Sequence, residues 1–353
     1  MLFRSLLRLF WSIRDKVSAR TGISYPIIVI QEAGLDGFWI HRVLVKEGIE
    51  SHVVDAASIA VSRRRRRAKT DKIDGEGLLR ALLAFKRGEP RVCSMVRVPT
   101  PQDEDRRRIC RERKTLTAER IRHVNRIKGL LFSQGIGDYE PLRRDRRRAL
   151  EAVRTGDGRA LGANMKAQIG RELDRLELLL DQIKAIEAER DAMLARQAEA
   201  EADQSDQSDQ SVRDAPARVQ KLMELNGLGA ETVAMLETEA FYRSFDNRRQ
   251  LAAFGGLAGT PWKSGSIDRE QGVSMGNHRL RQTMIQLAWL WPIHQPSSAL
   301  TRWYRERTKG ATKLQRKKMV VALARKLLMA LWRYVDAGVV IEGAVLKRAA
   351  RVR

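Results

Sequence analysis

Cysteine is scarce in this chain: only Cys93 and Cys110 occur among 353 residues. Neither has a further ligand residue at the spacing of a metal site, and two isolated thiols cannot form the disulfide framework of a small secreted protein. The low cysteine content therefore excludes a disulfide-stapled fold. It predicts free thiols in a reducing compartment, and hence a cytoplasmic location.

Long apolar runs are also absent. No stretch of about 18 uncharged apolar residues occurs, so the sequence predicts no membrane-spanning helix. Residues Met1–Arg20 are apolar and poor in acid, but arginines interrupt them too often for a secretory signal. A transit peptide is one interpretation of this segment. We expect instead an amphipathic helix that packs on the first sheet.

Acidic residues are few relative to basic ones. Asp and Glu total 43 against 67 Lys and Arg, which gives a net charge of +24 and a pI of about 10.7. Because neutralisation of phosphates supplies most non-specific affinity for nucleic acid, this excess predicts a nucleic-acid partner. An anionic membrane surface is the competing polyanion. The length of the chain predicts two to three domains.

Residues 1–101 show alternating strand and helix patterns, which favour a mostly parallel α/β sheet. The expected strands are Ile27–Ile30, His52–Val54 and Val92–Val98, and the expected helices are Gly37–Glu47 and Gly75–Phe85. Nothing before Ile23 resembles an opening strand of the sheet. The predicted fold class is therefore α/β here, followed by mostly α.

Residues 102–200 are rich in Arg, Glu, Leu and Ala and predict a helical arm. Helices are expected over Gln102–Gln134, stopped by Gly135, and over Met165–Ala200, where apolar residues recur every three or four positions. This is typical of a helical hairpin or a short coiled coil that protrudes or dimerises. Basic residues along Arg106–Lys128 fit either a nucleic-acid contact or a solvated charged face.

Composition changes at residues 201–217, where Asp-Gln-Ser occurs three times and a flexible linker is expected. Residues 218–340 form the second predicted domain, followed by a basic tail over 341–353. The first segment of the domain over residues 218–340, Leu222–Thr232, has the order helix, Gly-x-Gly, helix that is typical of a helix-hairpin-helix. Gly227 and Gly229 would let the backbone approach a phosphate at a helix N-terminus.

Two acidic positions suit a divalent cation. Asp71 and Asp74 stand three residues apart at a predicted helix start, which sets both carboxylates on one face. Glu32 ends a strand just before Ala33-Gly34. Carboxylate oxygens are the ligands that Mg²⁺ prefers. The alternative interpretation is that Asp71 caps the helix and Glu32 is a solvated strand end.

One serine is a candidate nucleophile. Ser264 is predicted to lie in a Gly-flanked loop between basic residues, where a base or metal could activate it and cations could hold a phosphodiester. The alternative is an ordinary turn serine. Basic and polar residues around these positions are predicted to contact nucleic acid: Arg63, Arg64, Arg65, Arg66, Arg67, Lys69, Lys263, Asn277, Arg279 and Arg281.

Several segments together resemble the DEDD-type insertion-sequence transposases, a family that includes the Piv-like DNA invertases. They are Glu32-Ala33-Gly34, Lys69-Thr70-Asp71 with Asp74, LAAFGGL at Leu251–Leu257, Ser264-Gly265, and Gly276–Arg281. The resemblance implies a ribonuclease-H-like N-terminal domain, a coiled-coil arm and a C-terminal domain with a nucleophilic serine. It also implies an acidic tetrad that binds Mg²⁺, and a guide RNA that selects DNA.

Carried over by motif, Glu32, Asp71 and Asp74 match three members of the tetrad, and Ser264 matches the serine. The first aspartate has no counterpart, because Asp15 lies in a helical context. We therefore expect an N-terminal domain without its opening strands. The resemblance implies a DNA recombinase. Because the carboxylates and the serine lie in different halves of the chain, we expect a dimer or tetramer to bring them into one site. The alternatives are an inactive nucleic-acid-binding remnant and a metal-dependent nuclease or junction resolvase without serine chemistry.

Overall fold

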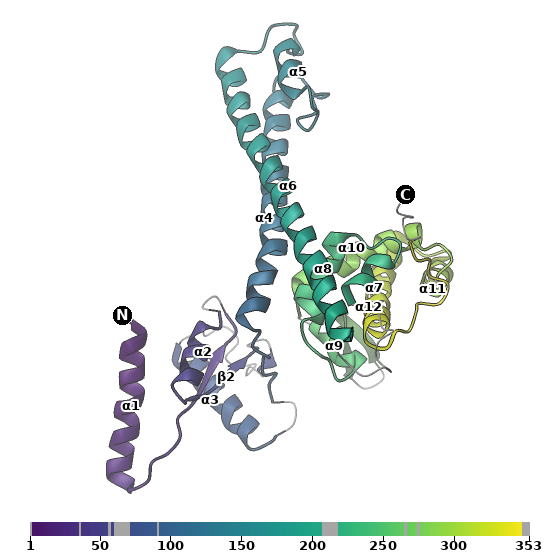
Figure 1. Cartoon of the computed structure of the whole chain (residues 1–353). Helices are drawn as coiled ribbons and strands as arrows, with labels where there is room; N and C mark the ends of the chain where they lie inside the picture. The colour runs from purple at the N-terminus through teal and green to yellow at the C-terminus, as the bar shows by residue number, and fades with distance from the viewer. Residues whose placement is uncertain are drawn as a thin grey trace. The chain divides into compact units, whose positions relative to one another are not determined.

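The computed structural model (Figure 1) describes residues 2–34, 37–55, 58–59, 71–89, 92–206, 218–264, 267–273 and 276–347. Within these ranges, residues 2–4, 202–206, 260–264 and 267–271 are described by their backbone alone. The chain divides into two compact units, Met1–Thr100 and Pro101–Arg353. Each unit is described by itself below.

The N-terminal unit is built on two parallel strands, β1 (Ile28–Glu32) and β2 (Glu50–Val54). Ile28 pairs with Glu50, and Glu32 with Val54. Parallel neighbours need a crossover, and α2 (Trp39–Lys46) supplies it, ending before Gly48 at a φ of 75°. Helix α3 (Asp71–Lys86) packs against β1. The predicted parallel α/β order is confirmed for these four elements.

The prediction of a third strand over Val92–Val98 is wrong. Only Met95 forms a bridge, antiparallel to Val54, with a 2.7 Å hydrogen bond from the Val96 amide to the Val53 carbonyl. The segment meets β2 only at the last residues of that strand, so no ladder of successive pairs develops. Apolar composition favoured a strand, but a strand also needs a partner along its length.

Helix α1 (Leu2–Thr21) confirms the predicted N-terminal helix, but its predicted packing on the sheet is wrong. None of its described side chains is buried, and Leu9 and Ile13 remain about half exposed. The reason is the small size of the sheet. Helix α2 contacts β2 and α3 contacts β1, so the two short strands already have helical neighbours.

The C-terminal unit begins with the predicted helical hairpin. Helices α4 (Pro101–Phe132) and α6 (Ala163–Asp206) lie side by side along the arm in Figure 1. Helix α4 ends before Gly135, at a φ of 78°. The short helix α5 (Arg146–Ala152) joins α6 through ion pairs from Arg146 and Arg147 to Glu177. Fully buried aliphatic residues hold this end of the arm together: Ile127, Leu131, Ile169, Leu173 and Leu176.

The predicted linker starts too early. Helix α6 continues through Asp206, and residues 207–217 lie outside the described part of the chain. Two features extend the helix past residue 200. Ala, Glu and Gln are good helix formers, and the Glu201 carboxylate accepts a 3.3 Å hydrogen bond from the Val219 amide. A residue anchored to the next helix is not part of a free linker.

The rest of this unit is a helical domain with one hairpin. The helices are α7 (Arg218–Glu224), α8 (Ala230–Leu236), the π-helical turn η3 (Glu237–Phe241), α9 (Arg248–Phe254), α10 (His278–His294), α11 (Ala299–Thr308) and α12 (Lys313–Ala337). Strands β3 (Gly259–Ser264) and β4 (Ile267–Val273) form the hairpin. Helix α12 contributes most to the core, with Leu323, Leu327 and Leu331 fully buried.

The predicted basic tail is wrong over residues 341–347, which pack back on the domain. Ile341 is buried, and Leu346 bridges to Leu225. The structure therefore agrees with an α/β unit followed by a mostly helical one. Among its described helices, none is both long and apolar enough to cross a bilayer.

Candidate functional site

The acidic candidates of the N-terminal unit lie where the sequence predicted. Glu32 is the last residue of β1 and is exposed. Asp71 and Asp74 occupy the first turn of α3, where Asp71 is exposed and Asp74 half-buried. Carboxylates at a helix N-terminus also interact favourably with the helix dipole. The position therefore suits both the structural interpretation and the metal-binding one.

The three carboxylates are not gathered into one group. Within the described ranges, no cluster of three or more His, Cys, Asp or Glu side chains could hold a metal ion. Asp71 and Asp74 remain a pair of oxygen donors on one helical turn. Mg²⁺ commonly takes one or two protein carboxylates and completes its shell with water and substrate phosphates, so a pair fits that ion. The predicted basic run Arg63, Arg64, Arg65, Arg66, Arg67 and Lys69 lies outside the described residues.

Ser264 lies on the hairpin of the C-terminal unit. It is the last residue of β3, paired with Ile267 of the antiparallel strand β4, and Lys263 pairs with Asp268. The serine was predicted in a loop, but it ends a strand. Gly265 and Ser266 lie outside the described residues.

Two of the motifs that carry the family resemblance pack backbone to backbone. A Cβ added to Gly276 would lie 2.4 Å from the Gly256 nitrogen and 2.7 Å from the Ala253 carbonyl oxygen. The Asn277 amide donates a 2.7 Å hydrogen bond to the Phe254 carbonyl. No side chain fits at position 276. The LAAFGGL segment thus sets the start of α10.

We predict that Gly276→Ala lowers the free energy of unfolding by about 2 kcal/mol, as overpacking of a close contact does. Urea unfolding followed by circular dichroism measures this. Gly129→Ala in α4 is the matched control, because nothing lies within 4 Å of an added Cβ there. That control should stabilise the chain slightly, since alanine favours the helix. Equal effects of the two substitutions would show that the close contact is unimportant.

Asn277, predicted to bind nucleic acid, has a structural role in the described fold. Its side-chain oxygen caps α10 by accepting from the Arg279 and Leu280 amides. Its amide nitrogen lies 2.9 Å from Oε2 of Glu239, whose other oxygen receives a 3.0 Å hydrogen bond from Arg111. Glu239 is only 2% exposed. Buried carboxylate oxygens need such hydrogen-bond donors to replace the water that they lose.

Asn277→Ala should lower the free energy of unfolding by more than the loss of a helix cap alone would. Asn247 caps α9 with the same two-amide geometry but does not contact a buried carboxylate. We therefore expect Asn247→Ala to cost about 1 kcal/mol and Asn277→Ala to cost roughly 1 kcal/mol more, because Glu239 loses a donor. Unfolding midpoints of the two variants measure the difference. Equal midpoints would mean that the contact with Glu239 contributes nothing.

The remaining predicted contacts differ in accessibility. Arg279 is exposed and Arg281 half-buried, on the first turns of α10. Gly227 and Gly229 lie in the turn that separates α7 from α8. A Cβ on Gly227 would lie 2.7 Å from the Cβ of His294, so packing alone requires glycine at this position.

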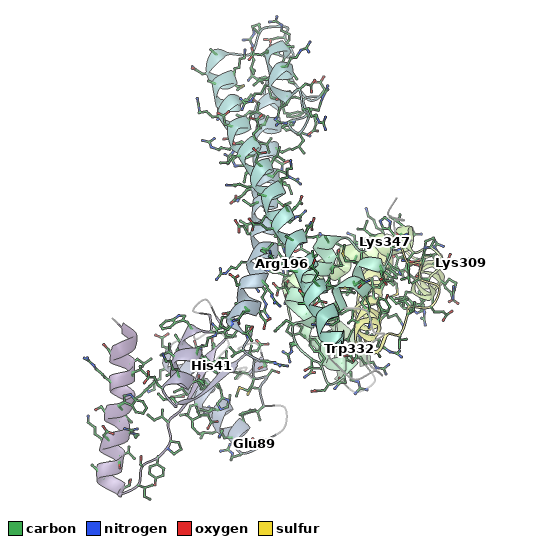
Figure 2. All side chains as sticks on the ribbon, in the orientation of Figure 1. His41, Glu89, Arg196, Lys309, Trp332 and Lys347 are labelled. Carbon is green, nitrogen blue, oxygen red and sulfur yellow. The ribbon has the colours of Figure 1, made fainter. Side chains whose placement is uncertain are left out.

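The Gly-x-Gly turn is also held from the C-terminal segment. Lys347, labelled in Figure 2, donates 2.7 Å hydrogen bonds from Nζ to the carbonyls of Met223 and Leu228. Gln295 donates to the Asn226 carbonyl at 2.8 Å. Both contacts fix the turn within the domain, so these glycines have a structural explanation that does not require a phosphate.

The sequence reasoning missed the buried acids. Glu237 and Glu239 lie in η3, and both are almost fully buried. The signal in the sequence that could have identified them is the occurrence of two acids within the apolar run Val233–Phe241. In the structure this segment lies opposite two arginines that are four residues apart on α4. Arg107 donates to the Thr238 carbonyl at 3.0 Å, and Arg111 pairs with Glu239.

Comparisons with known proteins find similarity to transposases. A family model described as "Transposase IS116/IS110/IS902 family" matches residues 219–305. The matched range runs from α7 to α11. It contains the β3–β4 hairpin and the two motifs that pack backbone to backbone, Leu251–Leu257 and Gly276–Arg281. The putative transposase y4rJ of Sinorhizobium fredii (strain NBRC 101917 / NGR234) is 65% identical over 344 residues, which cover 97% of this chain and 85% of that protein.

Proposed function

Because the chain belongs to the IS116/IS110/IS902 family of transposases, we propose that it cuts and rejoins DNA with Ser264 as the nucleophile. The observation that carries this proposal is the position of Ser264 at the end of β3, beside Lys263, inside the matched range. A serine hydroxyl has the chemistry of a nucleophile toward a phosphodiester, and a lysine adjacent in the sequence adds positive charge to the segment.

The proposed reaction is a transfer of the phosphoryl group to the protein. The Ser264 hydroxyl loses its proton to a base, its Oγ forms a bond to phosphorus, and one backbone P–O bond breaks. The departing oxygen takes up a proton, and a later attack by a DNA hydroxyl reverses these steps and frees the serine. No high-energy cofactor is consumed, because one phosphodiester replaces another.

We propose that Asp71 and Asp74 hold Mg²⁺ for this reaction. Glu32 is not part of the proposed metal site, because the three carboxylates are not gathered. The ion would neutralise charge on the non-bridging phosphate oxygens. The carboxylates and Ser264 belong to different units of the chain, so both units must reach the same phosphate, within one chain or between copies. The exposed Phe132 and Leu178 of the arm support assembly into a dimer or tetramer.

A guide RNA is the second proposed partner besides DNA. The net charge of +24 supports binding of a nucleic-acid polyanion. The basic surface alone does not separate RNA from DNA. Co-purification of RNA with the full chain, followed by sequencing of the RNA, tests this partner directly.

The test of the proposed function is a suicide substrate, a DNA end of the element with a nick that traps the covalent intermediate. Incubated with the full chain and Mg²⁺, it should yield an adduct that denaturing gels resolve. Cleavage without an adduct would favour a metal-dependent nuclease. Salt-sensitive binding with neither product would favour an inactive remnant, a candidate supported by the three carboxylates not being gathered.

A further inference from the structure

A concave, basic groove lies beside the hairpin in the C-terminal unit. It has a volume of about 850 Å³ and is formed by the start of α9, the base of the β3–β4 hairpin and one face of α12. Gly259, Gly272 and Val273 line it from the hairpin. Its cationic residues are Arg248, Arg249, Lys318, Arg325 and Lys326.

The described charged side chains that line the groove all have one sign. No Asp or Glu occurs among them, and no ion pair joins the five cations to any side chain that the structure describes. Lys326 instead lies 4.8 Å from the ring centroid of Trp303. On the arm, by contrast, Arg146 and Arg147 are paired with Glu177. Unpaired cations around a concavity focus positive potential and attract a polyanion.

The floor of the groove is apolar. It is formed by Leu257, Met319, Val321, Ala322 and Met329, of which Leu257 is buried and the others half-buried. A phosphate alone makes no use of such a surface. A nucleotide does, because its base presents an apolar face while its phosphate meets the cations.

The size of the groove selects among nucleic acids. Pockets of roughly 300–1,000 Å³ hold molecules of small-ligand size, which corresponds to one or two nucleotides. A duplex cannot place a base face on the floor, because its bases are stacked inside. An unpaired or extruded nucleotide can.

We propose that this groove holds one or two unpaired nucleotides of the DNA strand that is cut. The inference rests on the proposed function and names the part of the substrate that the C-terminal unit binds. Strand β3 starts at the groove with Gly259 and ends at Ser264, roughly 15–20 Å along an extended strand. A DNA strand anchored in the groove would therefore be guided along the hairpin toward the serine.

The test measures binding of a fluorescent 12-nucleotide DNA strand to the full chain without Mg²⁺, over a range of salt. Arg249→Gln/Lys318→Gln removes one exposed cation from each wall of the groove. Because each phosphate contact on a single strand contributes about 0.7 to the slope of log K against log salt, the slope should fall by about 1.4. Met319→Ala should weaken binding at every salt concentration and leave the slope unchanged.

The matched control is Arg307→Gln/Lys313→Gln, which removes two exposed cations outside the groove. It should keep the wild-type slope, and an equal loss in both variants would overturn the proposal. A duplex of the same sequence should be affected less than the single strand; equal sensitivity would also overturn it. A larger loss for the matching RNA strand than for DNA would assign the groove to RNA instead.

These measurements test the nucleotide-binding role of the groove independently of the proposed reaction of Ser264. If the wild-type chain forms no adduct in the suicide assay but the slopes behave as predicted, the proposed reaction fails and the groove stands. If the adduct forms and the groove variant binds with an unchanged slope, the groove assignment alone fails.

Discussion

Ser264→Ala should abolish the covalent protein–DNA adduct and leave DNA affinity within about twofold of the wild type. The alanine removes only the hydroxyl oxygen that would bond to phosphorus, and it keeps the strand pairing with Ile267. Loss of a nucleophile lowers such a reaction by orders of magnitude, because no neighbouring group replaces the missing bond. Denaturing gels of the suicide-substrate reaction and anisotropy titrations measure the two quantities.

Two nearby serines supply matched controls. Ser266→Ala and Ser274→Ala remove the same hydroxyl at positions close to Ser264 in the sequence. Both should keep the adduct. An adduct that persists in Ser264→Ala and disappears in one of these variants would reassign the nucleophile. Asp71→Ala gives a separate comparison: loss of cleavage there, with cleavage intact in Ser264→Ala, would indicate a nuclease that uses carboxylates alone.

The elements that the sequence predicted well are those whose determinants are local. Helix α2 ends shortly before Gly48 and α4 shortly before Gly135, and both glycines have positive φ, which is unfavourable for other residues. The arm follows from apolar residues spaced three and four apart, because that spacing places them on one helical face. No tertiary information is needed for these assignments.

The structural predictions that were wrong concern segments whose conformation depends on partners distant in the sequence. Whether Val92–Val98 forms a strand depends on how much of β2 it meets, and it meets only the end. Whether residues 341–347 are a tail depends on the Met223 and Leu228 carbonyls, which accept from Lys347. A pattern of residue types contains neither fact.

The same distinction holds at the candidate site. Asp71 and Asp74 lie on one helical turn, as their spacing predicts, and Gly276 is required by a contact with Gly256 that the sequence does not reveal. Asn277 shows that a polar residue in a family motif can serve the fold. Its cap and its contact with Glu239 account for it without a bound ligand.

Glu237 should make the stability of the chain fall as pH rises from about 5 to 8. The residue is 3% exposed in η3, and no hydrogen bond to its Oε1 is formed from the described residues. Oε2 accepts from Gln197 at 3.2 Å and lies 3.9 Å from an Arg218 nitrogen. Burial outweighs these favourable contacts and raises the pKa of the Glu237 carboxyl from 4.5 to about 7.

The sign of the effect follows from proton binding. Between pH 4.5 and 7 the folded chain holds a proton on Glu237 that the unfolded chain has released. Raising the pH therefore favours the unfolded state. The shift corresponds to about 3 kcal/mol, a contribution fully present below the unfolded pKa and lost as pH rises through the folded pKa.

Glu237→Gln isolates this contribution, because the amide has the same shape and does not ionise. Relative to the wild type, the variant should gain about 3 kcal/mol between pH 4.5 and pH 8 in urea unfolding. Glu177→Gln is the control. Hydrogen bonds from Arg147 lower the pKa of Glu177, so its carboxylate is ionised in both states above about pH 5.5, and its difference from the wild type should stay constant from there to pH 8. A constant difference for Glu237→Gln as well would mean that Glu237 is charged in the folded chain, with Arg218 rather than burial setting its pKa.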